Sequence, residues 1–123
     1  GSSPAALRRA ATLGDGWHPS GVSPEEFSMG RREIRELAAA AGRDPDGLAM
    51  SVRVEVEVTP GPSSTRAASR AHFPGDPDHM IAAIRAYQDA GVEHVVLALN
   101  SADVPRITSL MQTIARRVIP QFR

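Results

Sequence analysis

The first three residues of the chain have the chemistry of an anion site. Gly1, Ser2 and Ser3 stand before a helix that is predicted to start at Pro4. A helix N-terminus presents free backbone N–H groups and the positive end of the helix dipole, which together favour a phosphate group. Two other interpretations stay open. Ser3 can be an ordinary helix cap without a ligand, because serine is common there, or the three residues can be left from a purification tag.

Three charged side chains share one face of the clearest strand in the sequence. Residues 50–58 alternate strictly, with a valine at every second position from Val52 and with Arg53, Glu55 and Glu57 between the valines. In a closed barrel this polar face would line the interior. Alternatively it faces water, because unpaired charges inside a protein are costly.

The spacing of residues gives no support to several other kinds of chemistry. His72, His79 and His94 lack the H-x-x-x-H spacing of a metal pair, so no metal site is expected. The chain contains no G-x-S-x-G elbow, no G-x-G-x-x-G fingerprint and no Walker loop. Hydrolases, Rossmann dehydrogenases and P-loop enzymes therefore have no local motif here.

Helices and strands must alternate along the chain to position these residues. Proline starts, serine or aspartate caps and glycine stops predict helices over residues 4–14, 23–42, 76–91 and about 105–120. Strands are predicted near 15–18, 50–58 and 92–99, and the last is an apolar run typical of a parallel strand covered on both faces. Residues 59–71 are predicted to form a long loop. This order indicates right-handed βαβ units around a parallel sheet.

Composition excludes several classes of protein. The 123 residues carry 14 basic and 14 acidic side chains, so nothing favours a nucleic acid or an anionic membrane. The chain has no cysteine for disulfides, and its apolar runs are far shorter than the roughly 20 residues of a membrane span. We therefore expect one domain in a cytoplasmic protein. Three strands are too few for a complete eight-stranded barrel.

Four stretches carry a resemblance to a known family. They are residues 1–11, 14–17, 41–45 and 90–97, in this order and spacing. Together they resemble the luciferase-like monooxygenase superfamily, and within it the oxidoreductases that use the deazaflavin coenzyme F420. The resemblance implies an α/β fold, the C-terminal part of a TIM-type (β/α)8 barrel with three parallel strands. Residues 1–123 would be a single partial domain of a longer protein, and the usual catalytic residues would lie in the missing part.

The resemblance also implies roles for particular residues. Gly1, Ser2 and Ser3 would bind the phosphate of coenzyme F420, with flavin mononucleotide (FMN) as the alternative cofactor. Trp17, His18 and Arg53 would belong to the substrate pocket, because active sites in barrels gather at the carboxyl ends of the strands. Two alternatives stay open: the Trp17 ring can anchor the core, and His18 can be a surface residue.

The function implied is hydride transfer between deazaflavin and an unknown small organic substrate. The alternatives are an FMN-dependent luciferase-like monooxygenase and a non-catalytic, truncated α/β domain that associates with itself. The isolated chain is expected to be inactive, since the pocket of this family is built from several strands. It is also expected to form a homo-oligomer, because a sheet cut from a barrel has open edges.

Overall fold

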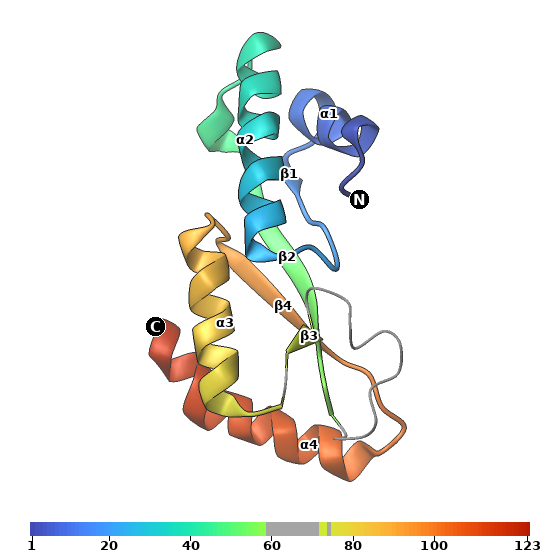
Figure 1. The fold of residues 1–123 in the computed structure, drawn as a ribbon, viewed down its shortest axis with the longest axis vertical. Helices are drawn as coiled ribbons and strands as arrows, with labels where there is room; N and C mark the ends of the chain where they lie inside the picture. The colour runs from blue at the N-terminus through green and yellow to red at the C-terminus, as the bar shows by residue number, and fades with distance from the viewer. Residues whose placement is uncertain (59–71, 74) are drawn as a thin grey trace.

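Helices and strands alternate as predicted in the computed structural model, which describes residues 1–58, 72–73 and 75–123 (Figure 1). The predicted loop at 59–71 lies outside the described residues. The elements are α1 (Pro4–Leu13), β1 (Gly16–Trp17), α2 (Pro24–Ala40), the 3-10 turn η1 (Pro45–Gly47), β2 (Ala49–Val56), β3 (His72–Phe73), α3 (Pro77–Asp89), β4 (His94–Leu99) and α4 (Val104–Thr113). Two further turns follow α4: the π-helical η2 (Ile114–Val118) and the 3-10 helix η3 (Ile119–Phe122).

The central strand of the sheet is β2, and all its partners run parallel to it. β4 pairs with β2 from Ser51–His94 to Val56–Leu99. β1 pairs with the first two residues of β2, and β3 with its last two. The three predicted strands are therefore confirmed as parallel, with small shifts of their ends. β3, which is two residues long, was not predicted.

The shifted start of β4 has a clear cause. The strand predicted over 92–99 begins only at His94, because Val92 closes the capping turn after α3 and donates its N–H to the carbonyl of Tyr87. Glu93 then donates to the carbonyl of Met50 and brings the chain beside β2. The capping turn of α3 therefore takes up Val92, the first residue of the predicted strand.

Side-chain caps fix where the helices begin. The hydroxyl of Ser3 accepts a 3.2 Å hydrogen bond from the N–H of Ala6 at the start of α1. Ser23 and Glu26 form a reciprocal capping box at the start of α2, with N–O distances of 3.1 Å in both directions. Both predicted serine-proline starts are confirmed.

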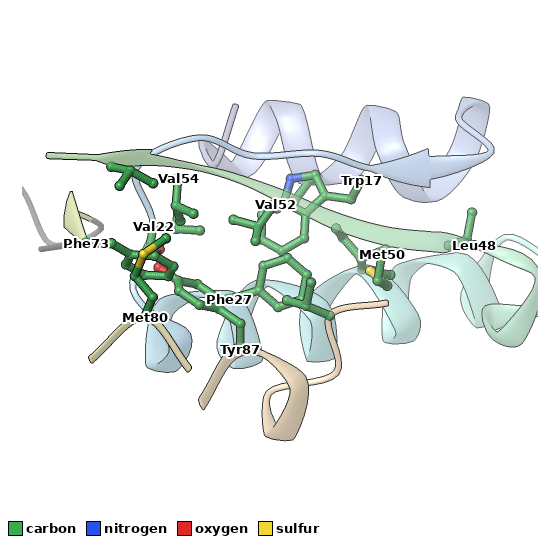
Figure 2. Packing of buried hydrophobic residues seen from close by; sticks show 14 of the residues in the cluster. Trp17, Val22, Phe27, Leu48, Met50, Val52, Val54, Phe73, Met80 and Tyr87 are labelled. Atoms are coloured by element: carbon green, nitrogen blue, oxygen red, sulfur yellow. Dashed lines mark hydrogen bonds between the residues drawn. The ribbon is translucent and has the colours of Figure 1, made fainter. Parts of the chain in front are cut away.

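The core lies between β2 and the helices α2 and α3 (Figure 2). The side chains of Val52 and Val54 have no exposed surface and point toward α2, where Phe27 is equally buried. Burial of these aliphatic and aromatic groups is the main source of stability. The alternation seen in the sequence thus assigns one face of β2 to the core and leaves Ser51, Arg53 and Glu55 on the other.

The expectation that β4 is covered on both faces is wrong. None of its residues is fully buried, and Val96 is 37% exposed. The helix α4 is similarly open: none of its residues is buried, and Met111 is 57% exposed. Among the described residues β4 pairs only with β2, so no strand covers its other edge.

The α-helix α4 ends at Thr113, but helical turns continue to Phe122, past the predicted end at residue 120. Pro120 was expected to end the helix, but Pro120 lies in the first turn of η3, where its missing N–H is not required. No helix in the described ranges is long and apolar enough to cross a membrane.

Tyr87 links α3 to the loop before α2 and should make stability depend on alkaline pH. Its side chain is 1% exposed, and its hydroxyl donates a 2.6 Å hydrogen bond to the carbonyl of Val22. Burial, with smaller contributions from Glu25 and Glu26, raises the pKa of Tyr87 from 10.0 to about 12. The folded state thus favours the protonated phenol. Its contribution to stability is complete below pH 10 and is lost as the pH rises toward 12.

We expect the free energy of unfolding in urea to fall between pH 10 and about 12 in the wild-type chain, and to fall much less in Tyr87→Phe. The chain has one tyrosine, no cysteine and no lysine, and arginine stays protonated, so no other side chain titrates in this range. The variant also loses one hydrogen bond, worth about 1 kcal/mol at neutral pH. Equal alkaline slopes in the two proteins would contradict this role for Tyr87.

Candidate functional site

The loop before α1 is held in place by Trp17. The indole Nε1 of Trp17 donates a 2.8 Å hydrogen bond to the carbonyl of Gly1. A Cβ on Gly1 would stand 3.3 Å from the Cβ of Ala6, so the loop lies close against the first turn of α1. Gly1, Ser2 and Ser3 are exposed. The structure therefore places all three predicted residues at an accessible helix N-terminus beside the end of β1.

The charge pattern of α1 suits an anion better than that of its neighbours. The first turn of α1 has no acidic residue, whereas Glu25 and Glu26 lie in the first turn of α2 and Asp78 in that of α3. A carboxylate in the first turn partly neutralises the positive end of the helix dipole. That end of α1 has no such partner in its first turn, so the residues present fit a phosphate group.

Trp17 itself is a core residue. Its side chain is 5% exposed and stacks on Phe27, with ring centroids 4.9 Å apart. Its ring also lies against Gly30, where a Cβ would come within 2.5 Å of the ring atom Cη2. The ring packs toward α2, as a core anchor would, and together with Ser2 and Gly30 it also lines a surface hollow. Its role in a substrate pocket stays a prediction. Trp17 still contributes to the loop through its bond to Gly1.

His18 lies on the opposite side of the sheet, which we call the inner face and define as the side of β2 that carries Ser51, Arg53 and Glu55. The Nδ1 atom of His18 is 2.7 Å from the hydroxyl oxygen of Ser51. The bridge between Ser20 and Arg53 continues the same alignment along β2. The structure thus brings His18 and Arg53 to one face and separates both from the Trp17 ring.

Arg53 belongs to a second polar group on the inner face. Its guanidinium is 3.5 Å from the carboxylate of Glu55, and the two side chains are 37% and 46% exposed. The amide of Asn100, the first residue after β4, donates to the same carboxylate at 3.5 Å. The polar face of β2 is therefore open and internally paired. An ion pair this exposed contributes little stability.

Two residues of this face, Ser51 and Asn100, were not singled out from the sequence. Ser51 occupies a polar position of the alternating strand, and Asn100 directly follows a predicted strand. Position in the pattern could have identified both. Ser51 is 33 residues from its partner His18, and Asn100 is 45 residues from its partner Glu55. The sequence pattern does not show contacts between residues so far apart.

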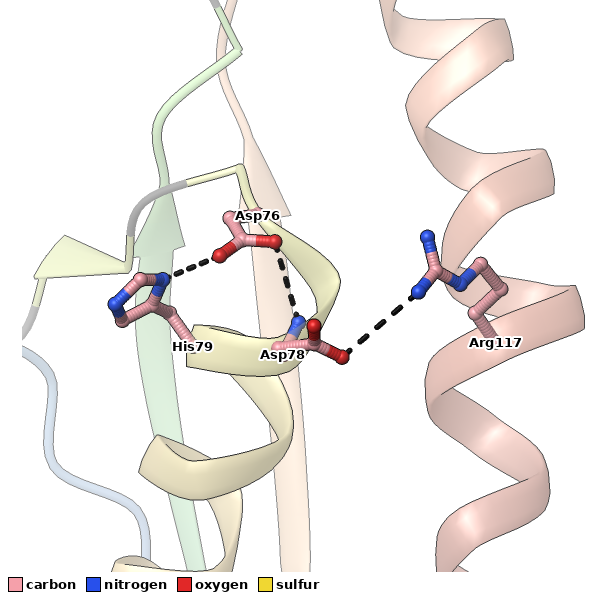
Figure 3. Close-up of polar contacts among 4 residues, drawn as sticks. All are labelled: Asp76, Asp78, His79 and Arg117. Carbon is pink, nitrogen blue, oxygen red and sulfur yellow. Dashed lines mark hydrogen bonds and ion pairs between the residues drawn. The ribbon is translucent and has the colours of Figure 1, made fainter.

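A separate polar cluster lies at the N-terminus of α3 (Figure 3). The carboxylate of Asp76 accepts hydrogen bonds from His79 and from the backbone N–H of Asp78, and Arg117 is 3.8 Å from the Asp78 carboxylate. The hydrogen bond from His79 lowers the pKa of Asp76 below 3.8. This cluster caps α3 and connects it to η2. In the described part of the chain, no group of three or more histidine and carboxylate side chains could hold a metal ion.

The fold is that of known F420-dependent enzymes. The chain superposes on the coenzyme F420-dependent tetrahydromethanopterin reductase from Methanopyrus kandleri with a TM-score of 0.76 and 16% identity, over 100% of this chain and 50% of that one. It superposes on an F420-dependent secondary alcohol dehydrogenase in complex with an F420-acetone adduct with a TM-score of 0.73 and 16% identity, over 95% of this chain and 46% of that one.

The chain thus spans about half the length of these solved structures, and its fold is part of a TIM-type barrel. A comparison with curated proteins gave no match. The family model of the luciferase-like monooxygenases matches residues 1–74, which is more than half of the chain. The chain therefore belongs to the luciferase-like monooxygenase family.

Proposed function

We propose that this chain is the C-terminal segment of an F420-dependent oxidoreductase acting on a small organic substrate, with FMN as the alternative cofactor. The observation that carries the proposal is the accessible N-terminus of α1, where Gly1, Ser2 and Ser3 are anchored to β1 through Trp17. Membership of the family and the similarity to two F420-dependent enzymes support it.

The residues of this chain would hold one end of the cofactor. The backbone N–H groups before α1 and the hydroxyl of Ser2 would bind the phosphate, while His18 and Arg53 would face the substrate from the inner face. The cofactor, when bound, supplies the hydride acceptor or donor, and the protein orients it. The remaining walls of the pocket would come from the preceding half of the barrel.

A second candidate is a non-catalytic domain that associates with itself. The edge of β4 with which no strand in the described ranges pairs favours it, together with the exposed apolar side chains of Val96, Val104 and Met111. Exposed edges and apolar patches invite pairing with another chain. A second copy of this chain is the partner we propose in that case.

A cofactor titration tests the phosphate site. The protein would be this chain joined to the residues that precede it in the reading frame, titrated with F420 and with FMN by fluorescence. We expect Ser2→Glu to weaken binding about tenfold, equivalent to about 1.4 kcal/mol, because it places a negative charge beside the phosphate. Ser2→Gln, which has the same size and no charge, is the matched control and should have a much smaller effect.

The variant is not expected to unfold, because an acidic residue near a helix N-terminus is favourable to the fold. Tighter binding of FMN than of F420 would favour the alternative cofactor. Equal affinities of wild type and Ser2→Glu would show that the phosphate binds elsewhere. Absence of binding by either cofactor would leave the self-associating domain as the better assignment.

A further inference from the structure

Ser51 occupies a central position on the inner face. On one side its hydroxyl oxygen is 2.7 Å from the Nδ1 of His18. On the other side its partner in the β2–β4 register is His94. Residues in register in parallel strands point to the same face, so Ser51 lies in one row between His94 of β4 and His18, the first residue after β1.

The contacts of Ser51 bear on which ring nitrogen of His18 carries the hydrogen. A serine hydroxyl has one hydrogen to donate and two lone pairs that accept. The Ser51 hydroxyl donates to the carbonyl of Trp17, at a long distance of 3.5 Å. An Nδ1–H on His18 lets both contacts form at once, because Ser51 then accepts from His18 while it donates to Trp17, whereas the other tautomer draws the single hydroxyl hydrogen to His18. A neutral ring with Nδ1–H has its lone pair on Nε2.

The two strands β2 and β4 present different side chains on the inner face near His18. On β2, Glu55 accepts from both Arg53 and Asn100, so the charges there are internally paired. On β4, the residues in register with Arg53 and Glu55 are Val96 and Ala98, which are apolar and small. A ligand on this face thus meets an imidazole acceptor beside a polar strand and an apolar strand.

We propose that Ser51 is a positioning residue that holds His18 with its Nδ1–H bound and presents Nε2 to the inner face as the acceptor for the hydroxyl of a small, partly apolar substrate. The class of substrate rests on the proposed function, whereas the orientation of His18 does not. An alcohol donates a hydrogen bond to this atom, and a ketone or a carboxylate has no hydrogen to donate.

Nitrogen-15 NMR of the 123-residue chain with labelled histidine tests the orientation. In the neutral state we expect His18 to be protonated mainly on Nδ1. His79 gives an internal reference, because the Asp76 carboxylate can only accept a hydrogen bond from its Nδ1. Ser51→Ala should change the tautomer ratio of His18 about fivefold toward Nε2–H, the effect of one ordinary hydrogen bond. Ser51→Thr, which keeps the hydroxyl, should restore the wild-type ratio.

The wild-type spectrum decides the matter even if Ser51→Ala does not fold. A neutral His18 protonated mainly on Nε2 overturns the proposal, and so does a ratio that Ser51→Ala leaves unchanged. If Ser51 only packed against β1, Ser51→Ala would leave the tautomer ratio of His18 unchanged, and Ser51→Thr would have no ratio to restore.

The substrate class is tested with two small probes on the chain joined to its preceding residues. At matched concentrations 2-propanol should shift the Nε2 resonance of His18 and acetone should not. An equal shift with both probes, or a shift with neither, overturns the assignment to a hydroxyl substrate. The cofactor titration is independent of this result, so a failure here is distinct from a failure of the proposed function.

Discussion

Trp17→Ala is expected to lower the free energy of unfolding by about 3 to 5 kcal/mol, the range for removing a large buried aromatic side chain. The ring is 5% exposed and stacks on Phe27, so the variant leaves a cavity between β1 and α2. It also leaves the carbonyl of Gly1 without its indole donor. Since domains are stable by only about 5 to 15 kcal/mol, a large fraction of the variant would be unfolded at moderate urea concentrations.

Gly30 provides a complementary test of the same contact. A Cβ at position 30 would come within 2.5 Å of the Cη2 of Trp17, and the stacked ring cannot move away. We expect Gly30→Ala to cost about 1 to 3 kcal/mol through overpacking. Trp17→Phe removes Cη2, so the double variant should be less unstable than the sum of the two single changes.

Urea unfolding followed by far-UV circular dichroism measures both effects. Gly47→Ala is the matched control, because a Cβ there meets its nearest neighbour, the Cβ of Asp44, only at 4.0 Å. Its stability should be close to that of the wild type. Additive effects of Trp17→Phe and Gly30→Ala would show that the two residues are not in contact in solution.

Local signals in the sequence were sufficient for most of the fold. The serine caps at Ser3 and Ser23 start helices because their hydroxyls satisfy backbone N–H groups within three residues. The alternation from Val52 to Val56 buries one face of β2 because successive strand side chains point to opposite sides. These rules act within a few residues, so they can be applied to a single sequence.

Features that depend on distant partners were not predictable in this way. The apolar run in β4 is typical of a covered strand, yet Val96, which is in register with Arg53 on the inner face, is 37% exposed. The pairing of His18 with Ser51 depends on the register between β1 and β2, which the pattern of each strand leaves undetermined. Trp17 and His18 are adjacent in sequence, and strand geometry sends them to opposite faces.

The second large effect concerns activity: the isolated 123-residue chain is expected to show at least about a 10³-fold lower turnover than the same chain joined to the preceding half of the barrel. Barrel active sites are assembled from several strand ends, and removing members of such a unit leaves little catalysis. This chain supplies the ends of β1, β2 and β4 and the loop before α1. A phosphate contact alone does not orient a redox centre, so cofactor binding should be weak as well.

The measurement is a hydride-transfer assay on both proteins, with F420 and with FMN, combined with sedimentation of the isolated chain. We expect the isolated chain to sediment as an oligomer, because the exposed Val96 and the edge of β4 that no described residue pairs with favour pairing with a second copy. A stable monomer would contradict that part. Turnover by the isolated chain with tight cofactor binding would show that the inner face around His18, Ser51 and Arg53 is a complete active centre, and that the missing strands serve mainly to close the barrel.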